Sequence, residues 1–593
     1  MEAAAAQGDV MRLKLTILLQ LTLSRLGNAA IYNSFEDLPI EDFDFIIIGG
    51  GAGGNVVANR LTENPAFSVL LLEAGPSPAG LINYTAPFFS IYLRQPGPFD
   101  WNYTLTSSGL NDRVITYPRG RILGGCTSIN GLGYLRGSQE DFNRYASVSG
   151  DLGWGWDALQ PYFRKNERWT RPTDNHKQSG QFNPIYHGFH GINAVSLSGF
   201  PVPVELNDRV AETIQELGND FPFNEDPNSG FPVGTYQEAW AQSNIKHGFR
   251  SSSFTSYLAE EFIARPNLHV VLNAQATRIL QTEPMSFRTV EFASARNAPR
   301  QTLTAYKEVI IAAGSLETPK LLMNSGIGDP DYLSSMNITP LVSLPDVGKN
   351  LSVHIAVSLV YNVNTTRTFD EIVRNATLRD ALTERWLDTN GTGPLGIPYI
   401  SHVVTKRLPS DAAIFQNTTD PAAGPNSPHL HTTIQNGDIN VTPSGFYLSL
   451  PATLLTPRGT IQLTSNAPFD PPLIDMASLT TPFDIFGLRE AVKMTHRFLS
   501  AHSVPSPLNA SNTEIETYLR QNAAPNGHVV GTASMAPVGA SWGVVDPDLR
   551  VKGVKGLRIV DASVLPYVPT GYTMTTTYMI AERGSDLIKA AWD

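Results

Sequence analysis

The feature that most constrains the fold is a short apolar run that leads straight into three spaced glycines. Residues 43–48 (FDFIII) have the composition of a buried parallel strand. Gly49, Gly51 and Gly54 follow in the spacing G-x-G-x-x-G, and a helix is predicted over residues 55–61. The first glycine permits a tight turn, the second lets a pyrophosphate approach the backbone, and the third lets helix and strand pack closely. The helix N-terminus then presents free N–H groups to phosphate oxygens.

A second strand and a terminal acid complete this unit. Residues 68–72 are predicted to form a strand that ends at Glu73, 19 residues beyond Gly54. A carboxylate at this distance typically binds the ribose of a dinucleotide. Strand, glycines, helix, strand and acid together predict a dinucleotide-binding βαβ unit, with a plain βαβ unit as the alternative. The motif itself leaves FAD and NAD open. Further core strands are predicted at residues 267–272 and 309–311.

Length and composition limit the remaining possibilities. A chain of 593 residues is too long for one simple core, so two or more lobes are expected. The net charge of −11 disfavours nucleic acid as the main partner. The single cysteine, Cys126, excludes an intramolecular disulfide framework and a cysteine-based zinc site. We expect Cys126 to fill tight space rather than to act in redox chemistry.

The N-terminal segment, residues 1–30, resembles a secretory signal, with a disordered tail as the alternative. Arg12 and Lys14 precede a short apolar stretch and a small-residue zone at residues 27–30, and Met11 could be the true start. Ten N-x-S/T acceptor sites support a secreted or secretory-pathway, N-glycosylated protein without a membrane span. They are Asn83, Asn102, Asn337, Asn350, Asn364, Asn375, Asn390, Asn417, Asn440 and Asn509.

Several longer motifs resemble one enzyme family. Residues 117–130 (YPRGRILGGCTSIN), followed by Arg136-Gly137, are similar to the first signature of the glucose-methanol-choline (GMC) oxidoreductases. Residues 313–328 are similar to the second signature. Residues 528–563 resemble the active-site region of the family. The resemblance extends from about residue 43 to 590, and the branch it suggests is that of the secreted aryl-alcohol oxidases.

The resemblance implies an α/β fold with two domains. A Rossmann-like FAD-binding domain is assembled from discontinuous segments, and a substrate-binding domain carries an antiparallel sheet. The FAD-binding segments are expected at residues 40–160, 250–345 and 520–593. The substrate-binding segments are expected at residues 161–249 and 346–519.

The resemblance also assigns the residues that contact FAD. The ADP part is assigned to Gly49, Gly51, Gly54 and Glu73, with Thr277 beside the adenine; the pyrophosphate and flavin are assigned to Gly124, Gly125, Asn130 and Asp561. Some members attach FAD through a histidine beside the first signature. Ile129 stands at that place, so we expect non-covalent FAD.

His528 matches the catalytic histidine of the family and is expected to take the hydroxyl proton while hydride passes to flavin N5. The family usually has a second His or Asn where this chain has Tyr572. A phenol donates a hydrogen bond but accepts a proton poorly below pH 7, so Tyr572 would orient the substrate oxygen. His354 lies in a family motif whose acid is replaced by Val353, and we expect it to be structural.

The substrate pocket differs from that of the aryl-alcohol oxidases. Gly131 and Gly527 stand where those enzymes have aromatic residues, which predicts a wider site for an aromatic or polyketide-like secondary metabolite. His429 and His431 could share one strand face as a metal pair, but no third ligand is evident, so no metal is predicted.

These expectations define a leading hypothesis and two alternatives. The first is a secreted FAD-dependent alcohol oxidase or dehydrogenase that passes electrons to O₂ or a quinone. The second is a non-redox lyase or cyclase that keeps FAD and uses His528 and Tyr572 as acid and base. The third is a non-catalytic binding protein stabilised by FAD. The partners expected are a small-molecule alcohol and the electron acceptor, with neither nucleic acid nor membrane.

Overall fold

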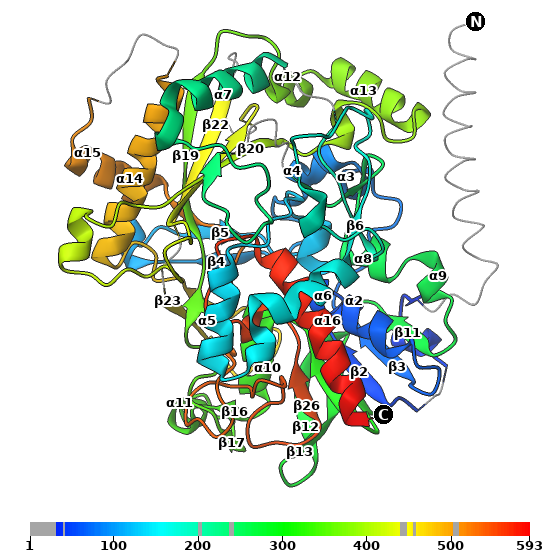
Figure 1. Cartoon of the computed structure of the whole chain (residues 1–593). Coiled ribbons are helices and arrows are strands. Elements are labelled where there is room, and N and C mark those ends of the chain that lie inside the picture. The colour runs from blue at the N-terminus through cyan, green and yellow to red at the C-terminus, as the bar shows by residue number, and fades with distance from the viewer. Residues whose placement is uncertain are drawn as a thin grey trace, which may run out of the picture.

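The computed structural model describes residues 31–39, 42–199, 204–235, 242–438, 447–454, 458–501 and 509–592. The predicted signal segment, residues 1–30, lies outside the described residues. Two six-stranded sheets dominate the fold and lie in different parts of the molecule (Figure 1). One sheet is parallel and the other antiparallel, which confirms the predicted fold class.

The parallel sheet has the strand order β1-β11-β3-β2-β15-β26. Every residue of its four central strands is buried, as the apolar runs of the sequence predict. Neighbouring strands pair in parallel throughout. The strands are β1 (Ile31–Tyr32), β2 (Phe45–Ile48), β3 (Val69–Leu72), β11 (Leu268–Val271), β15 (Glu308–Ile311) and β26 (Leu557–Ile559). The sheet therefore joins segments from the beginning, middle and end of the chain.

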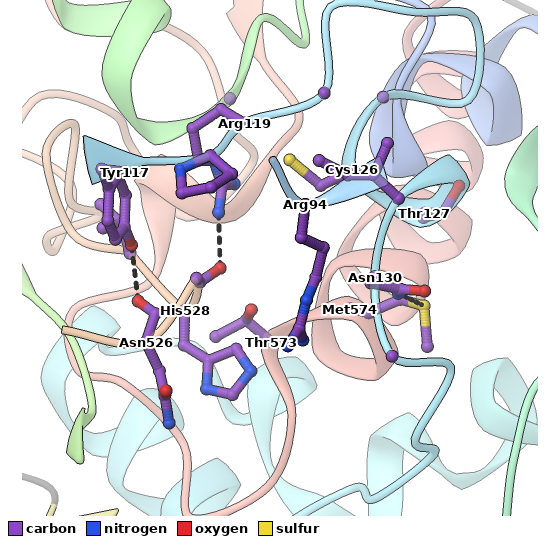
Figure 2. Close-up of a pocket in the computed structure, with 18 of the residues that line it drawn as sticks. Arg94, Tyr117, Arg119, Cys126, Thr127, Asn130, Asn526, His528, Thr573 and Met574 are labelled. Atoms are coloured by element: carbon purple, nitrogen blue, oxygen red, sulfur yellow. Dashed lines mark hydrogen bonds between the residues drawn. The ribbon is translucent and has the colours of Figure 1, made fainter. Parts of the chain in front are cut away.

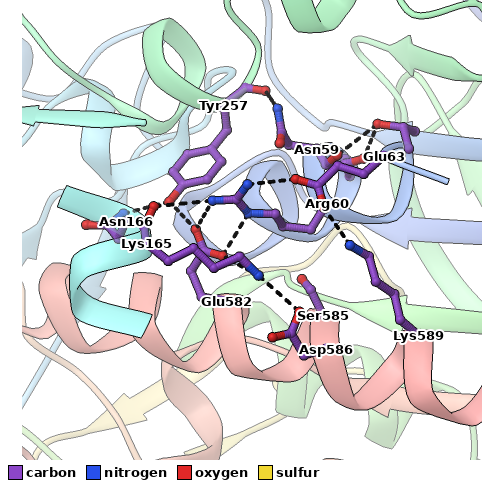
Figure 3. Close-up of polar contacts among 12 residues, drawn as sticks. Asn59, Arg60, Glu63, Lys165, Asn166, Tyr257, Glu582, Ser585, Asp586 and Lys589 are labelled. Atoms are coloured by element: carbon purple, nitrogen blue, oxygen red, sulfur yellow. Dashed lines mark hydrogen bonds and ion pairs between the residues drawn. The ribbon is translucent and has the colours of Figure 1, made fainter. Parts of the chain in front are cut away.

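Helices α2 (Ala52–Leu61) and α16 (Thr573–Trp592) pack against each other beside this sheet (Figure 1). A buried ion pair fastens them together (Figure 3). Arg60 of α2 donates to both carboxylate oxygens of Glu582 of α16 at 2.8 Å, and the Tyr257 hydroxyl donates to the same carboxylate at 2.7 Å. Since α2 begins at the glycine motif and α16 begins just after Tyr572, this contact ties two parts of the predicted site together.

The antiparallel sheet has the order β25-β19-β22-β21-β20-β8. Alternate residues of β21 point to opposite faces, as in any strand. His431 and Thr433 line the central cavity, while Thr432 faces α14 and contacts Thr495 at 3.1 Å. The elements are β8 (Gly234–Thr235), β19 (Ile355–Asn362), β20 (Ile400–Lys406), β21 (Leu430–Gln435), β22 (Tyr447–Leu454), β25 (Ala524–Pro525) and α14 (Pro482–Leu499).

Further helices surround the two sheets. Figure 1 shows α7, α12 and α13 near the antiparallel sheet and α5 and α6 beside α16. Their bounds are α5 (Gln139–Ser149), α6 (Trp156–Asn166), α7 (Val204–Leu217), α8 (Ser253–Tyr257), α10 (Gly314–Asn324), α12 (Phe369–Arg374), α13 (Ala376–Asp388) and α15 (Asn512–Asn522).

The predicted domain boundaries stay a prediction, although the two sheets draw on different segments. Five strands of the antiparallel sheet lie within residues 161–249 and 346–519. The sixth, β25, lies within residues 520–593, which the sequence analysis assigns to the FAD-binding domain. His528 therefore follows the last strand of the antiparallel sheet by only three residues.

Candidate active site

The glycine motif forms a tight loop between β2 and α2. Gly49 has a φ of +99°, and a Cβ atom there would lie 2.5 Å from the carbonyl oxygen of Ala312. A Cβ on Gly54 would lie 1.9 Å from the oxygen of Gly49, so this glycine permits the close approach of helix and strand. Gly51 differs, because no protein atom lies within 4 Å of its Cβ position. The open space beside Gly51 is where the sequence motif predicts a pyrophosphate.

The N-terminus of α2 opens into this space. Gly51 is the N-cap and supplies no side chain, so the first N–H groups of the helix are uncapped by a side chain. Glu73 follows β3 and accepts hydrogen bonds from the amides of Gly50 at 2.8 Å and Gly75 at 2.7 Å. Burial raises the pKa of Glu73 to about 7, although the hydrogen bonds from Gly75 and Gly50 oppose the rise. Glu73 lines the cavity with Gly49 and Gly51.

A second backbone segment closes the loop from the other side. Gly124, with a φ of +90°, donates its amide to the oxygen of Gly50 at 2.7 Å. A Cβ on Gly125 would lie 3.0 Å from the Cα of Gly51, so a larger residue would crowd the cradle. Asn130 lines the cavity, where its oxygen accepts from Arg250 at 2.8 Å. Gly54 and Gly124 shape this cradle without lining it.

Asp561 follows β26 and holds the start of α10. Its carboxylate accepts from the Gly314 amide at 2.9 Å and the Thr318 hydroxyl at 2.6 Å. Burial raises the pKa of Asp561. Asp561 lines the cavity together with Ile129, which occupies the predicted position of covalent attachment in other members.

The predicted place of Thr277 beside the adenine stays a prediction, although its hydroxyl is already engaged. Its hydroxyl donates to the backbone oxygen and the carboxylate of Glu291 on β13 (Ser286–Ala293), at 3.1 and 2.6 Å. The side chain is thereby used between two strands and does not line the cavity. Its neighbours Gln275 and Ala276, also on β12 (Gln275–Glu283), line it instead.

The cavity has a volume of about 830 Å³ and extends from the glycine loop to the antiparallel sheet. His528 and Tyr572 both line it at the end that faces this sheet, with ring centroids 5.4 Å apart. A Cβ on Gly133 would lie 2.5 Å from the Tyr572 ring, so glycine at this position leaves room for the phenol. Figure 2 shows His528 facing the same space as Arg94 and Thr573. The structure thus brings the two predicted catalytic residues together.

Two further histidines surround this pair, and the sequence analysis assigned neither to the active site. His354 Nδ1 lies 2.9 Å from His528 Nδ1, and the His431 ring lies 5.7 Å from that of Tyr572. Burial, followed by repulsion from His354, His431, Arg119 and Arg94, lowers the pKa of His528 well below its ordinary value. His528 is therefore an uncharged imidazole at neutral pH, able to accept a proton.

The wall of this end of the cavity is mixed, with polar side chains such as Thr433, Asn436 and Asp438 beside aromatic ones. Gly131 and Gly527 both line it, and the wider pocket expected from these glycines stays a prediction. Aromatic side chains reach it from other segments, and Phe88 and Phe369 pack at a centroid distance of 5.1 Å. Tyr399 also lines the cavity.

His429 and His431 do not form a metal pair. His429 lies just before β21, where its Nε2 is 2.8 Å from the carboxylate of Asp420 and its Nδ1 accepts from the Leu408 amide. The His431 ring packs near Tyr572 instead. Within the described part of the chain, no group of three or more His, Cys, Asp or Glu residues could hold a metal ion. Likewise, no described helix is long and apolar enough to cross a membrane.

The site fits FAD on its own geometry. The space beside Gly51, the uncapped start of α2 and the Glu73 carboxylate form a cradle for the ADP half of a dinucleotide. Asn130, Asp561 and the first residues of α16 continue along the same cavity toward His528. A dinucleotide that spans this cavity would place its redox-active end beside the histidine.

A dinucleotide cradle that ends beside a neutral histidine defines the class as an FAD-dependent oxidoreductase. The GMC oxidoreductase family profiles match residues 43–356 and 456–581. The chain belongs to the GMC oxidoreductase family.

Similar proteins cover nearly the whole chain. The dehydrogenase eriK of Hericium erinaceus is 38% identical over 607 residues, which cover 98% of this chain and 99% of its own. Pyranose dehydrogenase 3 of Leucoagaricus meleagris is 38% identical, covering 95% and 96%. The formate oxidase structure of Aspergillus oryzae has a TM-score of 0.85 at 28% identity, covering 94% and 99%. A fungal aryl-alcohol oxidase shares the fold, with a TM-score of 0.78 at 24% identity, covering 93% and 100%.

Proposed function

We propose that this protein oxidises an alcohol group of an aromatic or polyketide-like molecule. The observation that carries the proposal is the His528–Tyr572 pair, which lines the cavity at the end that faces the antiparallel sheet. FAD, when bound, supplies the hydride acceptor. His528 accepts the hydroxyl proton, and Tyr572 donates a hydrogen bond to the substrate oxygen. Burial raises the pKa of Tyr572, so its hydroxyl keeps its proton and remains a donor.

Pocket shape supports an aromatic or polyketide-like substrate. Phe88, Phe369 and Tyr399 supply aromatic surface, and the Tyr399 hydroxyl would lie 3.4 Å from a Cβ atom on Gly131. The relatives named pyranose dehydrogenases make a sugar the competing substrate class. A sugar presents many hydroxyl groups, for which the polar side chains of Thr433, Asn436 and Asp438 are the available partners, whereas an aromatic substrate would pack on Phe88, Phe369 and Tyr399.

Entry into the secretory pathway remains part of the proposal. The basic and apolar residues at 12–23 and the ten N-x-S/T sites support it. The ten sites are not equivalent. Asn350 donates its amide to the Ser534 hydroxyl at 2.7 Å and to the Pro566 oxygen at 3.0 Å, so it is engaged within the fold. The Asn102 amide likewise donates to the backbone oxygens of Gly97 and Asp100, at 3.2 and 3.0 Å. We expect glycans at the remaining eight sites, and mass spectrometry of the purified protein would map them.

The test is anaerobic absorbance of the purified flavoprotein while alcohols are added in turn. Aromatic and polyketide-derived alcohols are expected to bleach the oxidised-flavin band, and simple sugars are expected to bleach it more slowly at equal concentration. Rapid bleaching by sugars alone would overturn the substrate class. Conversion of a substrate without bleaching would overturn the oxidation and favour the lyase or cyclase alternative. O₂ and a quinone are then compared as electron acceptors.

A further inference from the structure

His354 lies directly behind the proposed base. It directly precedes β19 in sequence and is buried, whereas His528 is partly exposed, and both residues line the cavity. The two Nδ1 atoms are 2.9 Å apart, and the rings meet nearly at right angles, with an interplanar angle of 85°. On its other side, His354 Nε2 lies 2.9 Å from the backbone oxygen of Pro569. His354 therefore bridges a carbonyl group and the catalytic imidazole.

The direction of each hydrogen bond follows from the carbonyl. The Pro569 oxygen can only accept, so His354 Nε2 carries a hydrogen and donates it. Burial lowers the pKa of His354 to about 3, so this ring is neutral and carries only that one hydrogen. Its Nδ1 is then a lone pair that must accept. His528 Nδ1 is consequently the donor, which leaves the lone pair of neutral His528 on Nε2.

We propose that His354 is a positioning residue that holds His528 in the one tautomer whose Nε2 can accept the substrate proton. This inference rests on the proposed function, because it assigns the proton-accepting atom of the proposed base. In the step itself, the substrate O–H bond breaks and an N–H bond forms at His528 Nε2. The Nδ1 hydrogen of His528 remains donated to His354, and His354 does not change its protonation state.

Because the orienting group, His354, is neutral, it does not raise the pKa of His528 as a carboxylate would. The groups that face His528 are His354, His431, Arg119, Arg94 and Tyr572, and none of them is an acid. Among the described residues, no carboxylate hydrogen-bonds His528, in contrast to the aspartate of a serine protease triad. The orientation of His528 is fixed while its affinity for protons stays low. The enzyme should keep its unprotonated base under acidic conditions.

Three replacements of His354 by residues of nearly equal size separate its effect on the orientation of His528 from an effect of charge. His354→Asn keeps an acceptor oxygen where Nδ1 stands, His354→Leu has no acceptor, and His354→Asp has an acceptor with a negative charge. None of the three retains a ring Nε2 for Pro569, so the loss of that contact is shared and cancels in the comparison. The measurements are kcat/KM between pH 4 and 9, flavin content and thermal unfolding midpoint for each variant, with an alcohol that bleaches the flavin.

We expect His354→Asn to remain within about tenfold of the unmodified enzyme and His354→Leu to lose about 100-fold in kcat/KM, because only the latter releases the tautomer. His354→Asp should move the acidic limb of the pH profile upward by about 1–3 pH units. Equal losses in the Asn and Leu variants with an unmoved Asp profile would overturn the proposal.

Failure of the proposed function is recognised separately. His528→Asn tests the base itself and keeps a donor toward His354. If that variant keeps full activity, His528 is not the base, whatever the His354 variants do. If it is inactive while His354→Leu retains full activity, the base assignment stands and the positioning role is wrong. Should His354→Leu fail to fold, the comparison of the Asn and Asp profiles still decides the matter.

Discussion

Two groups of buried polar side chains in this protein carry charge in opposite ways. In the contact between α2 and α16, the buried charges of Arg60 and Glu582 are paired, and Lys165 lies 3.5 Å from the same carboxylate (Figure 3). Around His528, no carboxylate of the described residues hydrogen-bonds a histidine, and burial holds the rings neutral (Figure 2).

The difference indicates that the ion pair serves stability and that the histidine group serves catalysis. A paired buried charge is costly to disturb, because removing one partner strands the other in an apolar medium. A neutral imidazole with a free nitrogen can gain and lose a proton without such a partner. The first group should therefore govern stability and the second should govern rate.

The largest effect is expected from His528→Asn. Loss of the proton acceptor should lower kcat/KM by about 10²–10⁴-fold, which corresponds to about 3–5 kcal/mol in the barrier. Flavin content and the thermal midpoint should stay close to those of the unmodified protein, because no charge is stranded. If His528→Asn lowered the thermal midpoint as much as a substitution of Glu582 does, the histidine group would also govern stability and the contrast would be wrong.

The opposite pattern is expected from Glu582→Leu. The buried guanidinium of Arg60 loses its main partner, and the free energy of unfolding should fall by about 3–5 kcal/mol. The double variant Arg60→Met with Glu582→Leu strands no charge and should be more stable than the single variant. Chemical unfolding monitored by tryptophan fluorescence measures both. A double variant that is less stable than the single one would contradict the pairing argument.

A third group sharpens the comparison by its response to pH. His187 is buried between the carboxylates of Glu167, at 2.5 Å, and Asp226, at 2.7 Å, and Arg136 also binds Glu167. Burial alone would lower the pKa of His187, but the two carboxylates outweigh it and raise the pKa to about 9.

The sign of the resulting pH dependence follows from the raised pKa. The stabilisation is complete below pH 6.5 and is lost as the pH rises through 9, by about 3 kcal/mol in total. We expect the thermal midpoint to fall between pH 7 and 10 and His187→Gln to lack most of this fall. An identical pH dependence in the variant would show that His187 is not the titrating group.

The smallest effect is expected from Tyr572→Phe. The ring that packs against Gly133 is kept and only the hydroxyl is lost. One hydrogen bond to the substrate is worth about 0.5–1.5 kcal/mol, so kcat/KM should fall by up to about tenfold. Anaerobic flavin bleaching measures the rate of the step directly. A loss as large as that of His528→Asn would instead make Tyr572 an essential acid or base.

Local features of the sequence predicted much of the fold and one half of the site. The turn at Gly49, the open space at Gly51 and the acid at Glu73 depend on neighbours within one βαβ unit, which short motifs encode. Side-chain direction was harder to predict. Thr277 lies on a strand close to the cavity, but its hydroxyl is taken by Glu291 on the adjacent strand.

Contacts between distant segments were beyond reach of the motifs. His354 and His528 are 174 residues apart in sequence. The motif around His354 lacks the usual acid, and nothing in it predicts that the backbone oxygen of Pro569 orients the His354 ring. Arg60 and Glu582 are separated by 522 residues, and no sequence motif near either residue predicts their ion pair. The sequence shows an arginine on the helix that follows the glycine motif, but its burial and its partner are known only from the structure.

The last strand of the parallel sheet has a consequence for how the protein is made. Strand β26, Asp561, Tyr572 and α16 all emerge from the ribosome more than 500 residues after Gly51. At synthesis rates of about 5–20 residues per second, the glycine loop waits roughly 25–100 s for the elements that close its cradle. Cofactor capture therefore has to follow translation of α16. A message cut short before this helix would yield a chain that carries the nucleotide motif and yet cannot retain flavin.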